Sequence, residues 1–264
     1  MKIALIQSGI HWNDAARNLS CCELLIKQAA ADKARLVILP EMFSTGFSLL
    51  SGRAAREVAM KSSAFLEEQA AKHGVYVSAT QPWAPDENYD HPFNTMRVYG
   101  PNGHLGDYSK RHLFGMSSKE AALYRQGSDF LTLAVEDLRV SFFICYDLRF
   151  PLAFRRLAEN TDLFVLSANW PLSRLSQWRT LLCARAIDNQ AYVAGCNAVT
   201  EGDGVVYAGA SLIADPLGAI LAEAADQETI IYADLCPERI RQWRESFSIL
   251  ADGRADFPLF HGTC

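Results

Sequence analysis

Three side chains of this 264-residue chain have the types and local settings needed for nucleophilic catalysis. Cys145 ends an apolar run at 140–144 and precedes YDLRFP at 146–151, whose proline favours the first turn of a helix. A thiol at a strand-to-helix turn faces backbone N–H groups and the positive end of a helix, which favour a thiolate and an oxyanion. The setting predicts a nucleophile, although a buried packing cysteine also fits it.

Glu41 lies directly beyond a second apolar run, in LPEMF at 39–43. A carboxylate there must be paired, exposed or catalytic, because burying an unpaired charge is costly. With a raised pKa it could accept the thiol proton and then deliver it to a leaving amine. A surface glutamate after a strand is the alternative. No histidine has a context that places it beside Cys145, so the acid/base role falls to Glu41.

Lys110 lies in the basic segment YSKRHLF at 108–114. Its ammonium could stabilise a tetrahedral oxyanion and lower the pKa of a nearby thiol. The alternative for this lysine is a solvated basic loop.

Three apolar runs, at 36–39, 142–145 and 163–168, end in polar or proline-bearing turns. In open α/β sheets, ligands bind outside the carboxyl ends of the strands. Glu41, Cys145 and the pair Asn169-Trp170 are therefore expected to share one pocket.

The elements that must position these residues follow two hydrophobic patterns. Runs rich in β-branched and aromatic residues predict strands at 2–7, 35–39, 75–80, 95–99, 131–135, 138–145, 162–168, 191–198, 205–214 and 228–234. Helical periodicity predicts helices at 14–31, 61–73, 150–159, 174–189 and 237–250. Strands and helices alternate early, and hairpin-like strands dominate after residue 191. No linker divides the chain, which indicates one α/β domain spanning 1–264.

Composition narrows the function classes. Half of the residues are hydrophobic, and 25 Lys plus Arg face 30 Asp plus Glu, so the net charge is −5 and a phosphate-dependent nucleic-acid binder is disfavoured. No apolar run approaches the ~18 residues of a membrane span, and the first apolar stretch is too short for a signal peptide. The seven cysteines and six histidines show no C-x-x-C, H-x-x-H or regular spacing, so a disulfide framework and a metal site are not expected. A reduced, cytoplasmic setting fits best.

Taken in order, LPEMF at 39–43, YSKRHLF at 108–114 and CYDLRFP at 145–151 resemble the Glu, Lys and Cys motifs of the nitrilase superfamily of carbon-nitrogen hydrolases. The resemblance continues through ARAIDNQAYV at 184–193, YAGAS at 207–211 and DPLG at 215–218, and covers roughly residues 1–250. Within the superfamily, PEMFSTGF at 40–47 and SANWPLSR at 167–174 are most similar to the bacterial ω-amidase branch.

The resemblance implies an αββα sandwich, a homodimer, and hydrolysis of the terminal amide of short dicarboxylic monoamides such as 2-oxoglutaramate and 2-oxosuccinamate. It implies that Cys145 is the nucleophile and Glu41 the general base, then acid. Lys110 and the Tyr146 backbone N–H would hold the oxyanion. Glu120, seven residues before Gly127, matches the second glutamate of the family, which would orient Lys110. The dimer interface is expected at the helix 174–189 and the C-terminal segment.

The substrate carboxylate of such an amide calls for an arginine, because a guanidinium binds carboxylates through two parallel hydrogen bonds. Arg174 follows Trp170-Pro171 at the third strand end and is the candidate, with Trp170 and Tyr146 as pocket walls. A surface or dimer-interface arginine is the alternative. The chemistry requires no metal or organic cofactor, and the expected partner is a small amide.

Other functions remain open. Nitrile, N-carbamoyl or general aliphatic amide hydrolysis, or acyl transfer from the thioester, would use the same thiol mechanism. An inactive scaffold would also keep the fold. A thiol redox protein is a third class, although the chain has no motif for a resolving cysteine.

Overall fold

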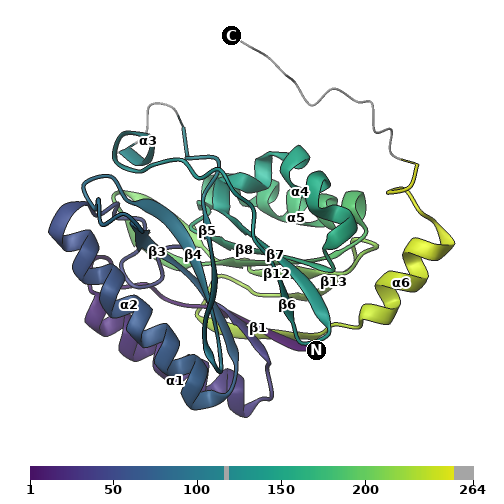
Figure 1. The fold of residues 1–264 in the computed structure, drawn as a ribbon, viewed down its shortest axis with the longest axis horizontal. Helices are drawn as coiled ribbons and strands as arrows, with labels where there is room; N and C mark the ends of the chain where they lie inside the picture. Colours follow the sequence, from purple (N-terminus) through teal and green to yellow (C-terminus); the bar gives the residue numbers. More distant parts are fainter. Residues whose placement is uncertain (116–118, 253–264) are drawn as a thin grey trace, which may run out of the picture.

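The computed structural model describes residues 1–115 and 119–252. Two six-stranded sheets pack face to face, and helices cover their outer faces (Figure 1). The first sheet has the order β14-β1-β2-β3-β4-β5 and the second the order β13-β12-β9-β8-β7-β6. The αββα architecture expected from the resemblance is confirmed.

The bounds of the strands are as follows. The first sheet contains β1 (Lys2–Gln7), β2 (Leu36–Ile38), β3 (Tyr76–Trp83), β4 (Phe93–Gly100), β5 (Gly103–Ser109) and β14 (Thr229–Asp234). The second contains β6 (Thr132–Val135), β7 (Leu138–Ile144), β8 (Leu163–Ala168), β9 (Tyr192–Asn197), β12 (Leu212–Ala214) and β13 (Ile220–Glu223). A separate hairpin consists of β10 (Val199–Gly202) and β11 (Val205–Ala208).

Helices α1 (Ala15–Ala31) and α2 (Gly52–His73) cover the first sheet, and α4 (Pro151–Leu157) and α5 (Leu175–Asn189) cover the second (Figure 1). The short α3 (Lys119–Leu123) and the later α6 (Pro237–Ser246) lie outside these layers. Asp14 caps α1, since its side chain accepts a hydrogen bond from the Arg17 N–H at 3.1 Å. Helix α2 ends at Gly74, whose φ of 63° is the left-handed conformation that glycine adopts without strain.

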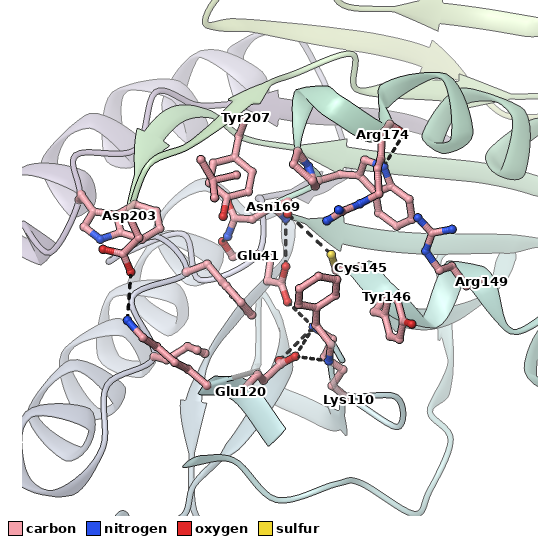
Figure 2. Close-up of a pocket in the computed structure, with 18 residues that line it drawn as sticks. Glu41, Lys110, Glu120, Cys145, Tyr146, Arg149, Asn169, Arg174, Asp203 and Tyr207 are labelled. Atoms are coloured by element: carbon pink, nitrogen blue, oxygen red, sulfur yellow. Dashed lines mark hydrogen bonds and ion pairs between the residues drawn. The ribbon is translucent and has the colours of Figure 1, made fainter. Parts of the chain in front are cut away.

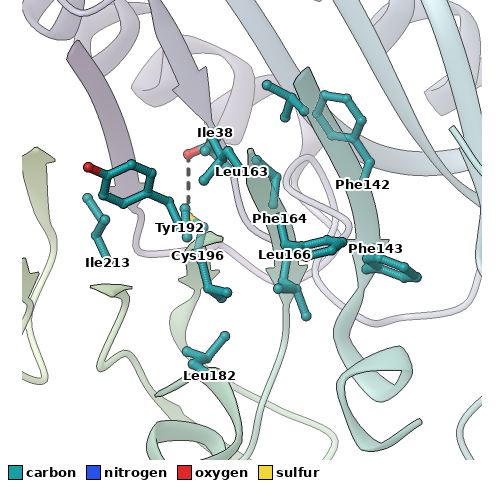
Figure 3. Packing of buried hydrophobic residues seen from close by; sticks show 14 of the residues in the cluster. Ile38, Phe142, Phe143, Leu163, Phe164, Leu166, Leu182, Tyr192, Cys196 and Ile213 are labelled. Carbon is teal, nitrogen blue, oxygen red and sulfur yellow. Dashed lines mark hydrogen bonds between the residues drawn. The ribbon is translucent and has the colours of Figure 1, made fainter. Parts of the chain in front are cut away.

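The central strands of both sheets are buried on both faces, which explains their nearly continuous apolar sequences. On β7, Phe142 and Phe143 point to opposite faces (Figure 3). Phe143 stacks on Phe154 of α4 with ring centroids 4.1 Å apart. On β9, the Cys196 Sγ lies 3.3 and 3.4 Å from the Ile6 and Ile38 carbonyl oxygens of the first sheet, either of which can accept its single hydrogen. Cys196 therefore joins the two sheets as a small core residue.

The differences from the expected elements have local causes. The expected strand 205–214 is two strands, because Gly209 and Ala210 adopt left-handed φ values of 66° and 55°. Helix α2 begins at Gly52, whereas the sequence predicts a start at residue 61. The apolar periodicity does not reveal its first turns, because they bury only the small residues Ala55 and Ala59. Strands β5, β10 and β13 were not expected, because each leaves many of its side chains exposed or half-buried.

The six cysteines within the described residues carry free thiols, and Cys264 lies outside those residues. No described helix is both long and apolar enough to cross a membrane.

Candidate active site

The carboxyl ends of β2, β7 and β8 meet at one edge of the sandwich, around a cavity of about 300 Å³. Every residue that the sequence assigned to the site lines this cavity (Figure 2). These residues are Glu41, Lys110, Glu120, Cys145, Tyr146, Trp170 and Arg174. The expectation of a shared pocket at the strand ends is therefore confirmed.

Cys145 begins the single 3-10 turn Cys145–Arg149 that connects β7 to α4. Its φ of 44° lies in the left-handed region, which costs a non-glycine residue about 1–3 kcal/mol. Met42, next to Glu41, also has a positive φ, of 49°. Strained backbone persists only where the surrounding structure holds it, so the packing around Cys145 and Met42 fixes the backbone at and beside the two site residues Cys145 and Glu41.

The electrostatic setting of Cys145 differs from the sequence expectation of a favoured thiolate. Burial and the negative charge of Glu41 raise the pKa of the Cys145 thiol well above its usual range, and the opposing effect of Lys110 is smaller. These effects favour the thiol form over the thiolate, and the Cys145 Sγ lies 3.9 Å from the Asn169 carbonyl oxygen. A nucleophile of this kind needs a base.

Lys110 is fully buried between two glutamates. Its Nζ lies 2.9 Å from Glu41 Oε1 and 2.9 and 3.1 Å from the two Glu120 oxygens, and neither glutamate side chain is exposed. Burial by itself would lower the pKa of Lys110, but the charges of Glu120 and Glu41 outweigh it, so the pKa of Lys110 is raised. The ammonium therefore stays charged beside the thiol.

Glu41 is held by donors on both carboxylate oxygens. Oε1 accepts hydrogen bonds from Lys110 and, at 2.8 Å, from Asn94 Nδ2, while Oε2 accepts the Asn169 N–H at 2.9 Å. Asn169 Nδ2 in turn donates to the Glu41 carbonyl oxygen at 2.7 Å. This cradle fixes the carboxylate in the cavity next to the thiol (Figure 2).

Glu120 is tied to the same centre. Its Oε2 accepts the Phe114 N–H at 2.6 Å, and its Oε1 accepts Asn94 Nδ2 at 3.0 Å. These contacts fit the orienting role that the resemblance implies for Glu120.

Asn94, which bridges the two glutamates, has no counterpart in the sequence predictions. It lies on β4, and its type and position resemble those of an ordinary strand residue. Arg149 also lines the cavity and is not among the sequence predictions, although its spacing of four residues from Cys145 could have indicated it.

The wider part of the cavity is aromatic and cationic. The Arg149 guanidinium carbon lies 4.8 Å from the Trp170 ring centroid, and that of Arg174 lies 5.3 Å from the Phe114 ring centroid. Trp170 Nε1 donates to the Arg174 carbonyl oxygen at 2.8 Å. Lys119 pairs with Asp203 at 4.0 Å, whereas neither arginine forms an ion pair within the described residues. Two arginines that form no ion pair with another described residue therefore line the cavity.

Gly127 helps hold the Lys110 segment in place, because its N–H donates a hydrogen bond to the Lys110 carbonyl oxygen at 2.9 Å. A Cβ at this position would lie 2.2 Å from the Ser109 carbonyl oxygen. We expect Gly127→Ala to displace Ser109 and Lys110, to destabilise the fold by about 1–3 kcal/mol and to lower kcat about tenfold or more. Thermal unfolding and steady-state kinetics measure the two effects.

Gly74→Ala is the matched control for this substitution. Gly74 lies at the end of α2, and a Cβ there would meet no atom within 4 Å. Its left-handed backbone predicts a loss of stability of about 1 kcal/mol with unchanged kcat. Equal kcat values for the two variants would contradict the positioning effect assigned to Gly127.

Within the described residues, no group of three or more His, Cys, Asp or Glu side chains is arranged to hold a metal ion.

The model of the carbon-nitrogen hydrolase family matches residues 2–245. The chain is 34% identical to the 2-oxoglutaramate amidase of Bacillus subtilis over 257 residues, covering 96% of this chain and 98% of that protein. It is 35% identical to the omega-amidase YafV of Yersinia enterocolitica, covering 100% of this chain and 96% of that protein. Among solved structures, XC1258 of Xanthomonas campestris, described as a CN-hydrolase superfamily protein with an arsenic adduct in the active site, aligns with a TM-score of 0.88 and 32% identity over 97% of both chains.

Proposed function

Because the chain belongs to the carbon-nitrogen hydrolase family, we propose that it is an ω-amidase that hydrolyses the terminal amide of short dicarboxylic monoamides such as 2-oxoglutaramate and 2-oxosuccinamate. The observation that carries this proposal is the pairing of two features in one cavity. A thiol, a glutamate and a lysine line the cavity, and so do Arg149 and Arg174, which form no ion pair with another described residue. The relatives named 2-oxoglutaramate amidase and omega-amidase support the same substrate class.

In the first half of the reaction, Glu41 removes the proton from the Cys145 thiol, and the sulfur attacks the amide carbonyl carbon. Lys110 and the Tyr146 backbone N–H stabilise the oxyanion, and a donor of this kind typically contributes about 10²–10³-fold in rate. The protonated Glu41 then gives its proton to the departing nitrogen. The C–N bond breaks, ammonia leaves, and an acyl thioester on Cys145 remains.

In the second half, Glu41 removes a proton from water, and the resulting hydroxide attacks the thioester carbonyl carbon. The same donors hold the second oxyanion. The C–S bond then breaks, the dicarboxylate product leaves, and the thiolate recovers its proton from Glu41. Glu120 orients Lys110 in both halves, and no step requires a metal or organic cofactor.

The distal carboxylate of the substrate is assigned to Arg174, with Trp170 and Tyr146 as walls of the pocket. We expect Arg174→Ala to raise KM for 2-oxoglutaramate about 10- to 100-fold, because a charge-assisted pair of about 1.4–2.8 kcal/mol is lost. The KM for a neutral aliphatic amide should change little. Steady-state ammonia release measures both values.

Arg179→Ala is the control for this variant. Arg179 lies on α5, which begins directly after Arg174, pairs with Glu223 at 2.9 Å and does not line the cavity. An unchanged KM for 2-oxoglutaramate in Arg174→Ala would exclude Arg174 as the carboxylate ligand and direct attention to Arg149.

The activity itself is tested by ammonia release from 2-oxoglutaramate and 2-oxosuccinamate, with asparagine, glutamine and a simple aliphatic nitrile as comparison substrates. Highest kcat/KM on the two oxo-monoamides is the expected result. Turnover of another amide or a nitrile alone would retain the thiol chemistry and reject the substrate. Absence of turnover on all of them would favour a scaffold.

We also propose a cytoplasmic homodimer. Exposed apolar side chains on and beside α4 and α5 support an interface there, with Leu152 51%, Leu172 51% and Ile187 49% exposed. The C-terminal segment, also assigned to the interface, lies beyond the described residues after position 252. Light scattering after size-exclusion chromatography measures the assembly, and a monomeric mass would contradict this interface.

A further inference from the structure

The turn that carries the nucleophile is anchored by a buried carboxylate two residues further on. Asp147 is fully buried and accepts the Ile144 N–H at 3.1 Å and the Tyr108 hydroxyl at 2.7 Å. Burial and the charge of Asp147 raise the pKa of Tyr108 well above its usual range, so this phenol remains a donor. Asp147 thereby joins the end of β7 to the end of β5, where Tyr108 lies.

His112 completes the shell of donors around this carboxylate. Its backbone N–H and its Nδ1 lie 3.0 and 2.8 Å from Asp147 Oδ1. Because an ionised carboxylate only accepts hydrogen bonds, Nδ1 carries the proton. The imidazole also stacks on Phe150, with ring centroids 3.6 Å apart and planes inclined by 7°.

These contacts bear directly on the catalytic geometry, because Lys110 lies between Tyr108 and His112 in the sequence. Both of these flanking side chains bind the same Asp147 carboxylate, and Asp147 lies in the turn that begins with Cys145. This junction therefore links the position of the lysine segment to that of the turn that carries the strained thiol.

We propose that His112 is a positioning residue for the amidase reaction: through Asp147, it holds the nucleophile turn in register with Lys110, so that the Lys110 ammonium and the Tyr146 N–H meet at one oxyanion. The inference rests on the proposed function for its reaction and adds a residue that contacts neither the thiol nor the cavity. It assigns His112 a role in kcat rather than in substrate affinity.

Two substitutions separate the hydrogen bond from the stacking. His112→Phe keeps a ring against Phe150 but removes the donor, whereas His112→Asn places an amide donor where Nδ1 was. We expect His112→Phe to lower kcat about 10- to 100-fold with KM within about threefold of the wild type, because small misplacements of reacting groups cost rates of this order. His112→Asn should recover kcat to within about fivefold of the wild type.

His104 provides a matched control. Its Nε2 lies 2.6 Å from Asp107 Oδ1 and its ring contacts Tyr99, but it does not line the cavity. His104→Phe should leave kcat unchanged. If His112→Phe does not fold, His112→Gln replaces it, because glutamine carries the same amide as asparagine but places its donor further along the side chain. The proposal then requires His112→Asn to have a higher kcat than His112→Gln.

A second measurement does not depend on the substrate. The rate of Cys145 alkylation by iodoacetamide, followed by mass spectrometry of the Cys145 peptide, reports the proximity of Lys110, whose charge lowers the pKa of the thiol. We expect alkylation to slow at least about threefold in His112→Phe and to recover in His112→Asn. This reading stands even if 2-oxoglutaramate is not the substrate.

Three results would overturn the proposal. The first is wild-type kcat and alkylation in His112→Phe. The second is a loss that His112→Asn does not recover. The third is an equal loss in His104→Phe.

Discussion

Replacement of Cys145 by alanine is expected to abolish ammonia release, with kcat at least about 10⁴-fold below the wild type. In the proposed mechanism the sulfur forms the covalent intermediate, and Cys145 is the one cysteine, serine or threonine among the described residues that line the cavity. Folding should be retained, because alanine removes one polar atom from a half-buried residue whose left-handed backbone is held by its neighbours. Steady-state kinetics and thermal unfolding measure the two properties.

The covalent step has its own signature. Acid quenching of the wild-type enzyme during turnover should yield a protein whose mass has increased by the acyl group, located on the Cys145 peptide. Cys145→Ala should show no such species. Cys236→Ala, at an exposed cysteine outside the cavity, is the control and should behave as the wild type. Substantial turnover by Cys145→Ala would rule out the thioester mechanism.

The part of the site that sequence could reveal is the part carried by strand ends. Glu41 and Cys145 each follow an uninterrupted apolar run, and such a run ends where a buried strand leaves the sandwich. Lys110 follows β5, which was not predicted, so its assignment came from its motif rather than from its element. The motifs thus indicate the proposed reacting groups without knowledge of the elements that carry them.

The supporting groups were harder to find, because their partners are set by pairings between distant strands. Asn94 on β4 reaches Glu41, which follows β2, and Glu120, which lies on α3, because the fold brings these distant segments together. Asn169 reaches Glu41 because the two sheets meet at β2 and β8. A local pattern does not contain these pairings. The expectation that the turn favours a thiolate fails for the same reason, because burial and the carboxylate of Glu41, which comes from another strand end, raise the pKa of the Cys145 thiol.

The second large effect is expected for Glu41→Gln, which keeps the shape of the side chain and an oxygen that can accept the Asn169 N–H but removes the base. Amide hydrolysis should fall about 10²–10⁴-fold, because an amide can neither take the thiol proton nor deliver one to the leaving nitrogen. Glu136→Gln, at a surface glutamate paired with Arg35 at 2.7 Å, should keep the wild-type kcat.

The same variant should change Cys145 in the opposite direction. The negative charge of Glu41 raises the pKa of the thiol and that of Lys110 lowers it, so removing the carboxylate leaves the effect of Lys110 unopposed by Glu41. The pKa of Cys145 is then lower, and more thiolate is present at a given pH. Alkylation by iodoacetamide needs a thiolate but no proton for its leaving group.

We therefore expect Glu41→Gln to be alkylated faster than the wild type at neutral pH while its hydrolysis of amides is lost, and the midpoint of the alkylation pH profile to shift to lower pH. A general loss of folding would slow both reactions, or expose every cysteine alike. Parallel loss of alkylation and hydrolysis in a folded protein would mean that Glu41 holds the thiol in place rather than transferring its proton. The two readouts together thus separate the chemistry of Glu41 from its contribution to the architecture of the site.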